Sequence, residues 1–157
     1  YDELGEKEKA WYYYFKSYEF DDSRQEAFFE LIKKCRARNE FKTGYKLYKM
    51  LKPCLDGDKQ HKLFIENHIY EHSLYSEMAI ILYYLNKKDE IIEIFKKLFL
   101  ANITIPIYIF MTNNNLKYFI PNIRKDDWEF YGKFQRYCKK FEVPIDLIKQ
   151  MDKLFIE

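Results

Sequence analysis

Apolar side chains recur along this chain at the three- and four-residue spacing that is typical of amphipathic helices. Polar stretches at Asn39 and at Asn86 interrupt this pattern and predict short turns between neighbouring helices. Ser23, followed three residues later by Glu26, predicts a capping box at the start of the second helix. In total, the spacing predicts helices over residues 6–20, 23–38, 40–52, 69–86, 88–101, 126–140 and 144–156.

Two stretches share the spacing of the tetratricopeptide repeat, in which large residues of one helix pack against small residues of the next. The first set is Phe28, Leu31, Ile32, Cys35, Gly44 and Tyr48, and the second is Tyr75, Met78, Ala79, Leu82, Ile91 and Phe95. The two sets are 47 residues apart instead of the usual 34. This difference predicts an insert at about residues 53–68. Ala10 and Tyr14 lie 34 residues before Gly44 and Tyr48 and indicate a further, partial unit upstream.

We therefore predict an all-α fold, a tetratricopeptide-like α-solenoid of antiparallel helix pairs with a C-terminal helical cap. The degenerate repeats cover residues 1–121, and the capping helices cover residues 122–157, because the terminal units of solenoids must cover an exposed apolar face. Within the first part, the spacing of the repeat can no longer be recognised after residue 103. Thr112 to Asn115 make a poor helix interior there. A non-repeating helical bundle is the alternative fold.

Composition supports helices and excludes several classes of function. The 157 residues include 31 aromatic residues but only 8 glycines and prolines, too few turn-forming residues for a many-stranded sandwich or barrel. A net charge of +2 lacks the strongly basic field of nucleic-acid-binding proteins. No apolar stretch is long enough to span a bilayer. Because the chain begins at Tyr1 without Met, we interpret it as a fragment of a longer protein.

Four segments, in order, resemble the helical repeat region attached to family 2 glycosyltransferases, including those of large DNA viruses. The segments are EKAWYYYFKSYEF at 8–20, FKTGYKLY at 41–48, LFIENHIY at 63–70 and EMAIILYYL at 77–85, with Ser23-Arg24 before the second predicted helix. The resemblance covers about residues 8–120. It implies a non-catalytic module that accompanies a sugar transferase, whose α/β catalytic domain has no counterpart in these 157 residues.

No arrangement of reactive residues predicts catalysis, so whether the parent protein is an enzyme stays open and no cofactor is expected. Asp56-Gly57-Asp58 has the D-x-D form that holds a divalent cation in many glycosyltransferases, but no buried strand precedes it and we interpret it as a turn. His68 and His72 share a helical spacing without the HExxH context of a zinc site. Cys35 falls at a packing position of the repeat.

The cysteines and the resemblance together predict a compartment. Cys35, Cys54 and Cys138 are odd in number, widely spaced and without a CxxC pair, which argues against a disulfide framework. We therefore expect the protein in a reducing compartment, the cytoplasm. If the protein is viral, we expect it in the host cytoplasm or in the virion.

Surplus aromatic residues point to partner binding. Trp11 to Phe15 are five consecutive aromatics that cannot all face one side of a helix. In tetratricopeptide repeats the first helix of each pair lines a concave groove. By position, this face comprises Phe29, Lys33, Arg36, Ile80, Tyr83 and Tyr84. We predict that it binds an extended or helical peptide of a protein partner, with a glycosyltransferase catalytic domain as one candidate. The alternatives are a fragment of such an enzyme and a structural protein that self-associates, for example as a homodimer.

Overall fold

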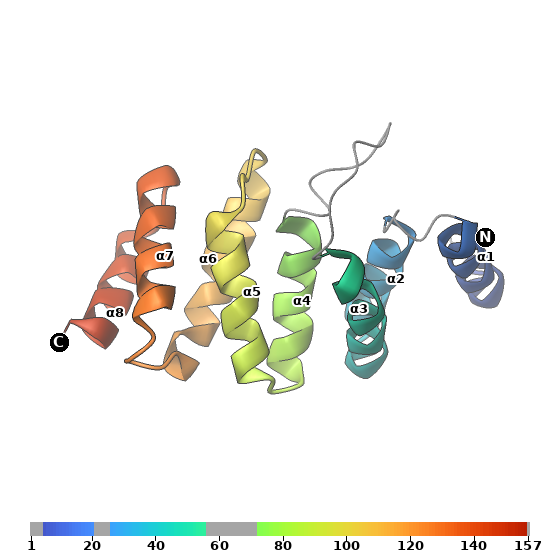
Figure 1. Cartoon of the computed structure of the whole chain (residues 1–157), viewed down its shortest axis with the longest axis horizontal. Coiled ribbons are helices and arrows are strands. Elements are labelled where there is room, and N and C mark those ends of the chain that lie inside the picture. The colour runs from blue at the N-terminus through green and yellow to red at the C-terminus, as the bar shows by residue number, and fades with distance from the viewer. Residues whose placement is uncertain (1–4, 21–25, 56–71, 157) are drawn as a thin grey trace. The chain divides into compact units, whose positions relative to one another are not determined.

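The computed structural model describes residues 5–20, 26–55 and 72–156, and within these ranges every regular element is helical (Figure 1). The predicted all-α class is therefore confirmed for the described chain. The capping box at Ser23, the D-x-D sequence and His68 lie outside the described residues, as does most of the predicted insert. No helix in the described ranges is long and apolar enough to cross a bilayer.

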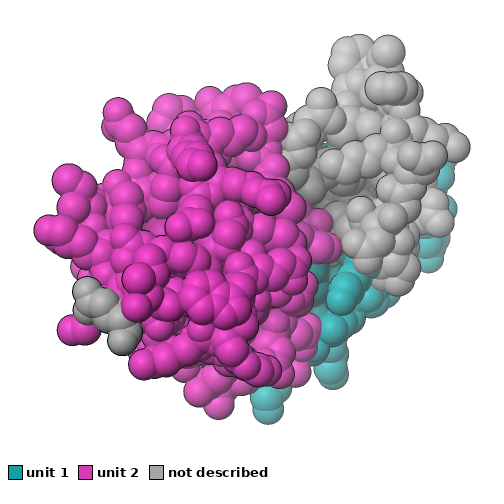
Figure 2. All heavy atoms as spheres, turned by 60° about the vertical axis from the view of Figure 1, so that its left-hand side comes forward, with its two compact units in different colours: residues 1–70 teal, residues 71–157 magenta. Residues whose placement is uncertain are grey.

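The chain divides into two compact units, residues 1–70 and 71–157 (Figure 2). This boundary falls just after the predicted insert. We predicted a boundary between repeats and cap at residue 121, and this position lies inside the second unit. Whether the repeats end there stays a prediction. Residues 122–157 belong to the same compact unit as the helices that precede them.

The first unit contains α1 (Lys7–Phe20), α2 (Glu26–Ala37) and α3 (Phe41–Leu55). α2 packs against both α1 and α3. Phe15 of α1 meets Phe28 of α2 edge to face, with ring centroids 5.4 Å apart. Lys7 donates to a carboxylate oxygen of Glu40 at 2.9 Å, which ties the start of α1 to the residue before α3.

Two turns of the same geometry end α2 and α4 (Leu74–Tyr84). Asn39 and Asn86 have φ of 58° and 55°, the left-handed conformation that asparagine tolerates better than most residues. In the first turn the N–H of Glu40 donates to Cys35 O and the N–H of Asn39 donates to Arg36 O. In the second turn the N–H of Lys87 donates to Leu82 O and the N–H of Asn86 donates to Tyr83 O. Both turns are Schellman motifs, and they lie 47 residues apart. The two predicted turns are confirmed.

The second unit contains α4, α5 (Lys88–Leu100), α6 (Pro106–Phe119), the 3-10 turn η2 (Ile120–Asn122), α7 (Trp128–Lys140) and α8 (Ile145–Phe155). α6 packs on α4, α7 packs on α5, and α8 packs on α7. In Figure 1 the ribbon of α6 lies behind α5, and α7 follows α5 along the unit.

An aromatic cluster joins the helices of the second unit. The ring of Phe99 lies 5.2 to 6.0 Å, centroid to centroid, from those of Phe95, Phe130, Phe134 and Tyr137. All five side chains are buried. Aromatic side chains bury large apolar areas, so this cluster accounts for part of the aromatic excess as packing.

α6 corrects the sequence prediction at Thr112 to Asn115, which was wrong because these residues lie inside a continuous helix. Thr112 Oγ1 donates to Tyr108 O at 2.8 Å, one turn back along the same helix. Asn113 Oδ1 accepts from Tyr137 Oη at 3.1 Å, and its Nδ2 donates to Glu142 O at 3.3 Å. Tertiary hydrogen bonds therefore satisfy polar groups whose helix propensity is poor.

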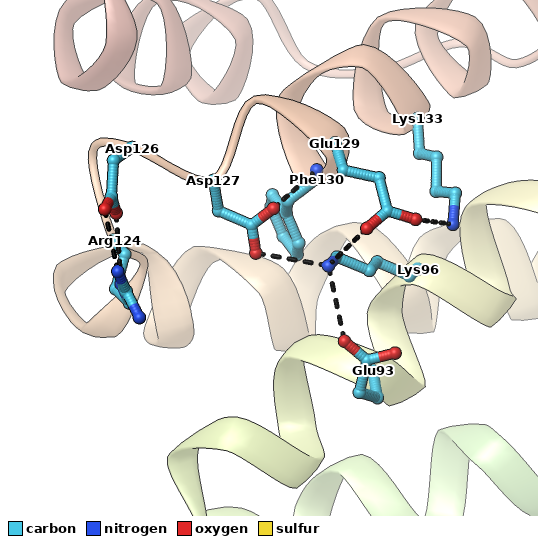
Figure 3. A network of polar contacts seen from close by, with 8 residues as sticks. All are labelled: Glu93, Lys96, Arg124, Asp126, Asp127, Glu129, Phe130 and Lys133. Carbon is cyan, nitrogen blue, oxygen red and sulfur yellow. Dashed lines mark hydrogen bonds and ion pairs between the residues drawn. The ribbon is translucent and has the colours of Figure 1, made fainter.

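A buried lysine joins α5 to the start of α7. Lys96 Nζ lies 3.0 Å from Glu129, 3.3 Å from Asp127 and 3.3 Å from Glu93 (Figure 3). Asp127 also caps α7 by accepting from Phe130 N at 3.0 Å. Burial disfavours the lysine charge, but hydrogen bonds to these carboxylates outweigh it and raise the pKa of Lys96.

The packing positions of the two predicted repeats are all buried in the structure. Each member of the first set has a buried counterpart 47 residues later, and the correspondence extends to Leu47 with Ile94 and to Leu51 with Leu98. The prediction of which residues form the core of the two helix pairs is therefore confirmed.

Candidate binding pocket

A pocket of about 450 Å³ opens on the second unit between α4, α5 and α6. A volume of this size lies within the range of ligand-binding clefts. Its lining comprises Ala79, Ile80, Tyr83, Tyr84, Ile91, Phe95, Asn115, Tyr118 and Phe119. The pocket therefore combines five aromatic side chains with three aliphatic ones and a single amide.

α4 supplies the rim of the pocket. Tyr83 and Tyr84 are 47% and 63% exposed, and their rings meet at 84° with centroids 5.6 Å apart. They are the last two residues of α4, directly before the Schellman turn, so the turn sets their position. Ala79 is one turn earlier on the same helix, and its small side chain leaves room beside the rings.

α5 and α6 supply the floor and the far wall. Phe95 and Phe119 are buried and stack with centroids 5.8 Å apart and an angle of 22° between their planes. Tyr118, on α6, is 61% exposed and adds a third tyrosine to the rim. Stacked buried rings make a rigid apolar base, because each fixes the orientation of the other.

None of the residues that line the pocket carries a charge. An ion entering it would lose water without gaining an opposite charge, so the pocket favours neutral groups. Asn115 Nδ2 is buried and has no hydrogen-bond partner within the described chain. A buried amide without a partner is costly, and a ligand carbonyl or hydroxyl oxygen would satisfy it.

The structure brings together three of the six partner-binding residues that the sequence predicted, namely Ile80, Tyr83 and Tyr84. The other three belong to α2 in the first unit. Phe29 is buried, with 7% of its surface exposed, so it offers little area to a partner. Lys33 is exposed, and its Nζ lies 3.4 Å from Glu30 Oε1 and 5.8 Å from the ring centroid of Phe29. Arg36 is half-buried.

Sequence reasoning missed the contribution of α6. Asn115, Tyr118 and Phe119 line the pocket, yet Asn115 ends the segment in which no continuous helix was expected and the other two residues follow it. Their spacing of three and four residues was the available signal. Had the helix been extended through Thr112 to Asn115, these side chains would have fallen on one face.

Reactive groups gather nowhere in the described residues. No group of three or more potential metal-ligating side chains occurs there. Cys35 is buried in the first unit, and burial raises the pKa of its thiol, which lowers its reactivity at neutral pH. Burial also raises the pKa of Cys138 to about 11. His72 is buried and its ring lies 4.3 Å from that of Tyr108.

Comparison of the chain with protein-family models, with curated proteins and with solved structures finds no match.

Proposed function

We propose that this chain is a non-catalytic helical-repeat module that binds a partner protein, taking a neutral apolar or aromatic side chain of the partner into the pocket between α4, α5 and α6. The observation that carries the proposal is the pocket itself, which is open, aromatic and without charge. Exposed tyrosines around a rigid apolar base are typical of anchor sites at protein interfaces.

The repeat architecture is part of this proposal. Three features support an α-solenoid of antiparallel helix pairs: the identical turns at Asn39 and Asn86, the buried positions 47 residues apart, and the packing of α6 on α4 and of α7 on α5. In such a solenoid each helix packs on its counterpart in the next repeat. The proposed cap, residues 122–157, contains α7 and α8, which pack on each other.

The partner to test first is a glycosyltransferase catalytic domain, because the chain's sequence resembles regions attached to such enzymes. The chain would then be an accessory region or a fragment of that enzyme. The pocket proposal does not depend on this identification, since an aromatic anchor can come from any protein.

A peptide-display selection on the purified chain tests the pocket. We expect the enriched peptides to carry an aromatic or large aliphatic anchor, and Tyr83→Ala/Tyr84→Ala to weaken their binding at least tenfold, about 1.4 kcal/mol. Tyr12→Ala/Tyr13→Ala is the matched control. That pair, on α1, is 56% and 52% exposed and meets edge to face at 5.3 Å, but lies outside the pocket. Equal losses in both variants would reject the pocket as the binding site.

Self-association is a second candidate, favoured by α6. Ile107, Phe110 and Tyr118 lie on one side of this helix and are 54%, 65% and 61% exposed. Exposed apolar stripes of this kind mark interaction sites. Sedimentation equilibrium decides this candidate. It predicts a dimer that Phe110→Glu dissociates, and a monomer at high protein concentration would exclude it.

A further inference from the structure

Three consecutive asparagines of α6 differ in how their side-chain amides are satisfied. Asn113 is buried, accepts a hydrogen bond from Tyr137 Oη at 3.1 Å and donates one to Glu142 O at 3.3 Å. Asn114 is exposed, so water satisfies its amide. Asn115 is half-buried and lines the pocket, and its buried Nδ2 has no hydrogen-bond partner within the described chain. The unsatisfied amide of the three is therefore the one at the pocket.

The other residues that line the pocket offer no comparable polar group. Among them, within the described part of the chain, Asn115 alone has a buried side-chain nitrogen or oxygen without a partner. Phe95 and Phe119, at the base, have no polar side-chain atom. The three tyrosines of the rim are 47% to 63% exposed, and hydrogen bonds formed at such a rim replace bonds to water with little net gain. Asn115 is therefore the polar group from which a buried ligand gains most.

We infer that the pocket takes a tyrosine of the partner protein, and that Asn115 selects this tyrosine by forming a hydrogen bond with its hydroxyl. The inference rests on the proposed function, which by itself requires only a neutral apolar or aromatic anchor. Asn115 is a specificity-determining residue in this arrangement, and the aromatic lining supplies the apolar contact for the ring.

The hydrogen-bonding groups of the aromatic side chains explain the choice. Phenylalanine has none, and tryptophan has a donor but no acceptor for the NH2 group of Asn115. Histidine carries a charge over part of the physiological pH range, which an uncharged pocket disfavours. The tyrosine hydroxyl both accepts and donates. It can therefore bond to either end of the asparagine amide, whose two ends exchange on rotation about the terminal bond.

The same bond also determines how strongly the pocket discriminates. A hydroxyl that enters an apolar pocket loses its hydrogen bonds to water, and this is costly unless a protein group replaces them. Asn115 replaces one of these bonds and satisfies its own Nδ2 in the same step. Removing the amide should therefore weaken the binding of a phenol, whereas a plain aromatic ring loses nothing.

Two small probes test the inference. p-Cresol and toluene correspond to the side chains of tyrosine and phenylalanine and differ by one hydroxyl. Nuclear magnetic resonance titration of the ¹⁵N-labelled protein gives both dissociation constants. Asn115→Leu, of similar size but without the amide, should bind p-cresol at least fivefold more weakly than the wild type and toluene no more weakly. Asn114→Leu, the same substitution at the exposed neighbour outside the pocket, should keep the wild-type ratio of the two constants.

A second measurement uses the wild type alone. The side-chain NH2 resonances of Asn115 should shift more with p-cresol than with toluene, because the hydroxyl bonds to the amide. Circular dichroism checks that each variant keeps its helices. If Asn115→Leu does not fold, these wild-type resonances decide, and equal shifts with both probes would overturn the inference.

The outcomes separate the tyrosine inference from the pocket proposal. An unchanged ratio of dissociation constants in Asn115→Leu, or an equal change in Asn114→Leu, would overturn the choice of tyrosine and leave the pocket as a site for apolar anchors. If neither probe binds the wild type, or if Tyr83→Ala/Tyr84→Ala leaves their binding unchanged, the pocket proposal fails and the inference fails with it.

Discussion

The pair α2–α3 and the pair α4–α5 are two versions of one helix–turn–helix. They share the Schellman turn and a set of buried positions 47 residues apart. Their surfaces differ at the same positions. Lys33 and Arg36 of α2 stand where α4 has Ile80 and Tyr83. The buried positions are therefore repeated while the surface positions are not, as expected if the buried positions determine the fold of each pair.

A second difference concerns volume. Ile32 of α2 and Ala79 of α4 occupy equivalent buried positions. The smaller side chain on α4 lines the pocket, whereas Ile32 is fully buried. The two pairs therefore differ in side-chain volume at one equivalent packing position, and in the second pair the smaller residue lines the pocket.

The largest effect is expected at the shared core. Leu51→Ala and Leu98→Ala each remove a fully buried side chain at equivalent positions, and each should lower the free energy of unfolding by about 2–5 kcal/mol. Urea denaturation followed by circular dichroism measures both. A loss in one variant without a comparable loss in the other would break the equivalence of the two pairs.

A smaller loss of unfolding free energy is expected at Lys96 and Lys49, which occupy equivalent positions in the two pairs, and the two losses should differ. Lys96→Met leaves Asp127 without its cation and should cost about 1–3 kcal/mol. Lys49→Met removes an exposed charge whose ammonium lies 5.1 Å from the ring centroid of Tyr45, and we expect it to lower the free energy of unfolding by less than Lys96→Met does. The same urea titrations apply. Equal costs would mean that α7 adds nothing to the environment of Lys96.

The two turns should respond alike and modestly. Asn39→Ala and Asn86→Ala place a residue that disfavours positive φ at these positions and should each cost about 1 kcal/mol, whereas the glycine variants should be at least as stable as their alanine counterparts. Thermal unfolding of the four variants ranks them. An alanine variant more stable than its glycine counterpart would contradict the assignment of the turn.

The smallest effect is a pH dependence at Glu129 of α7, which is paired with Lys96 of the second helix pair. Hydrogen bonds from Lys133 and Lys96 lower the pKa of Glu129 to about 2. A depressed pKa stabilises the fold at pH values above the ordinary carboxyl pKa, and this contribution is lost as pH falls from about 4.5 toward 2.

Comparing wild type with Glu129→Gln between pH 6 and pH 2.5 isolates this contribution, since the variant has no carboxylate to protonate. The variant's stability should fall less over this interval than that of the wild type. Parallel curves would show that Glu129 is not stabilised by its lysine partners.

The sequence by itself determined the all-α class, the turns at Asn39 and Asn86 and the buried positions of the two pairs. These depend on local spacing: apolar residues at helical intervals must be buried, and asparagine tolerates a positive φ. The positions of Ile80, Tyr83 and Tyr84 in the repeat also predicted that these residues share one surface, and residues three and four apart do share a helix face.

Only the tertiary structure decided the rest. α6 is helical through Thr112 to Asn115 because Tyr137 and Glu142, distant in sequence, complete the hydrogen bonds of Asn113. Lys96 is buried because α7 brings Asp127 and Glu129 to it. The pocket needs α6 beside α4 and α5. Each depends on contacts between segments far apart in the chain, which periodicity along one helix cannot predict.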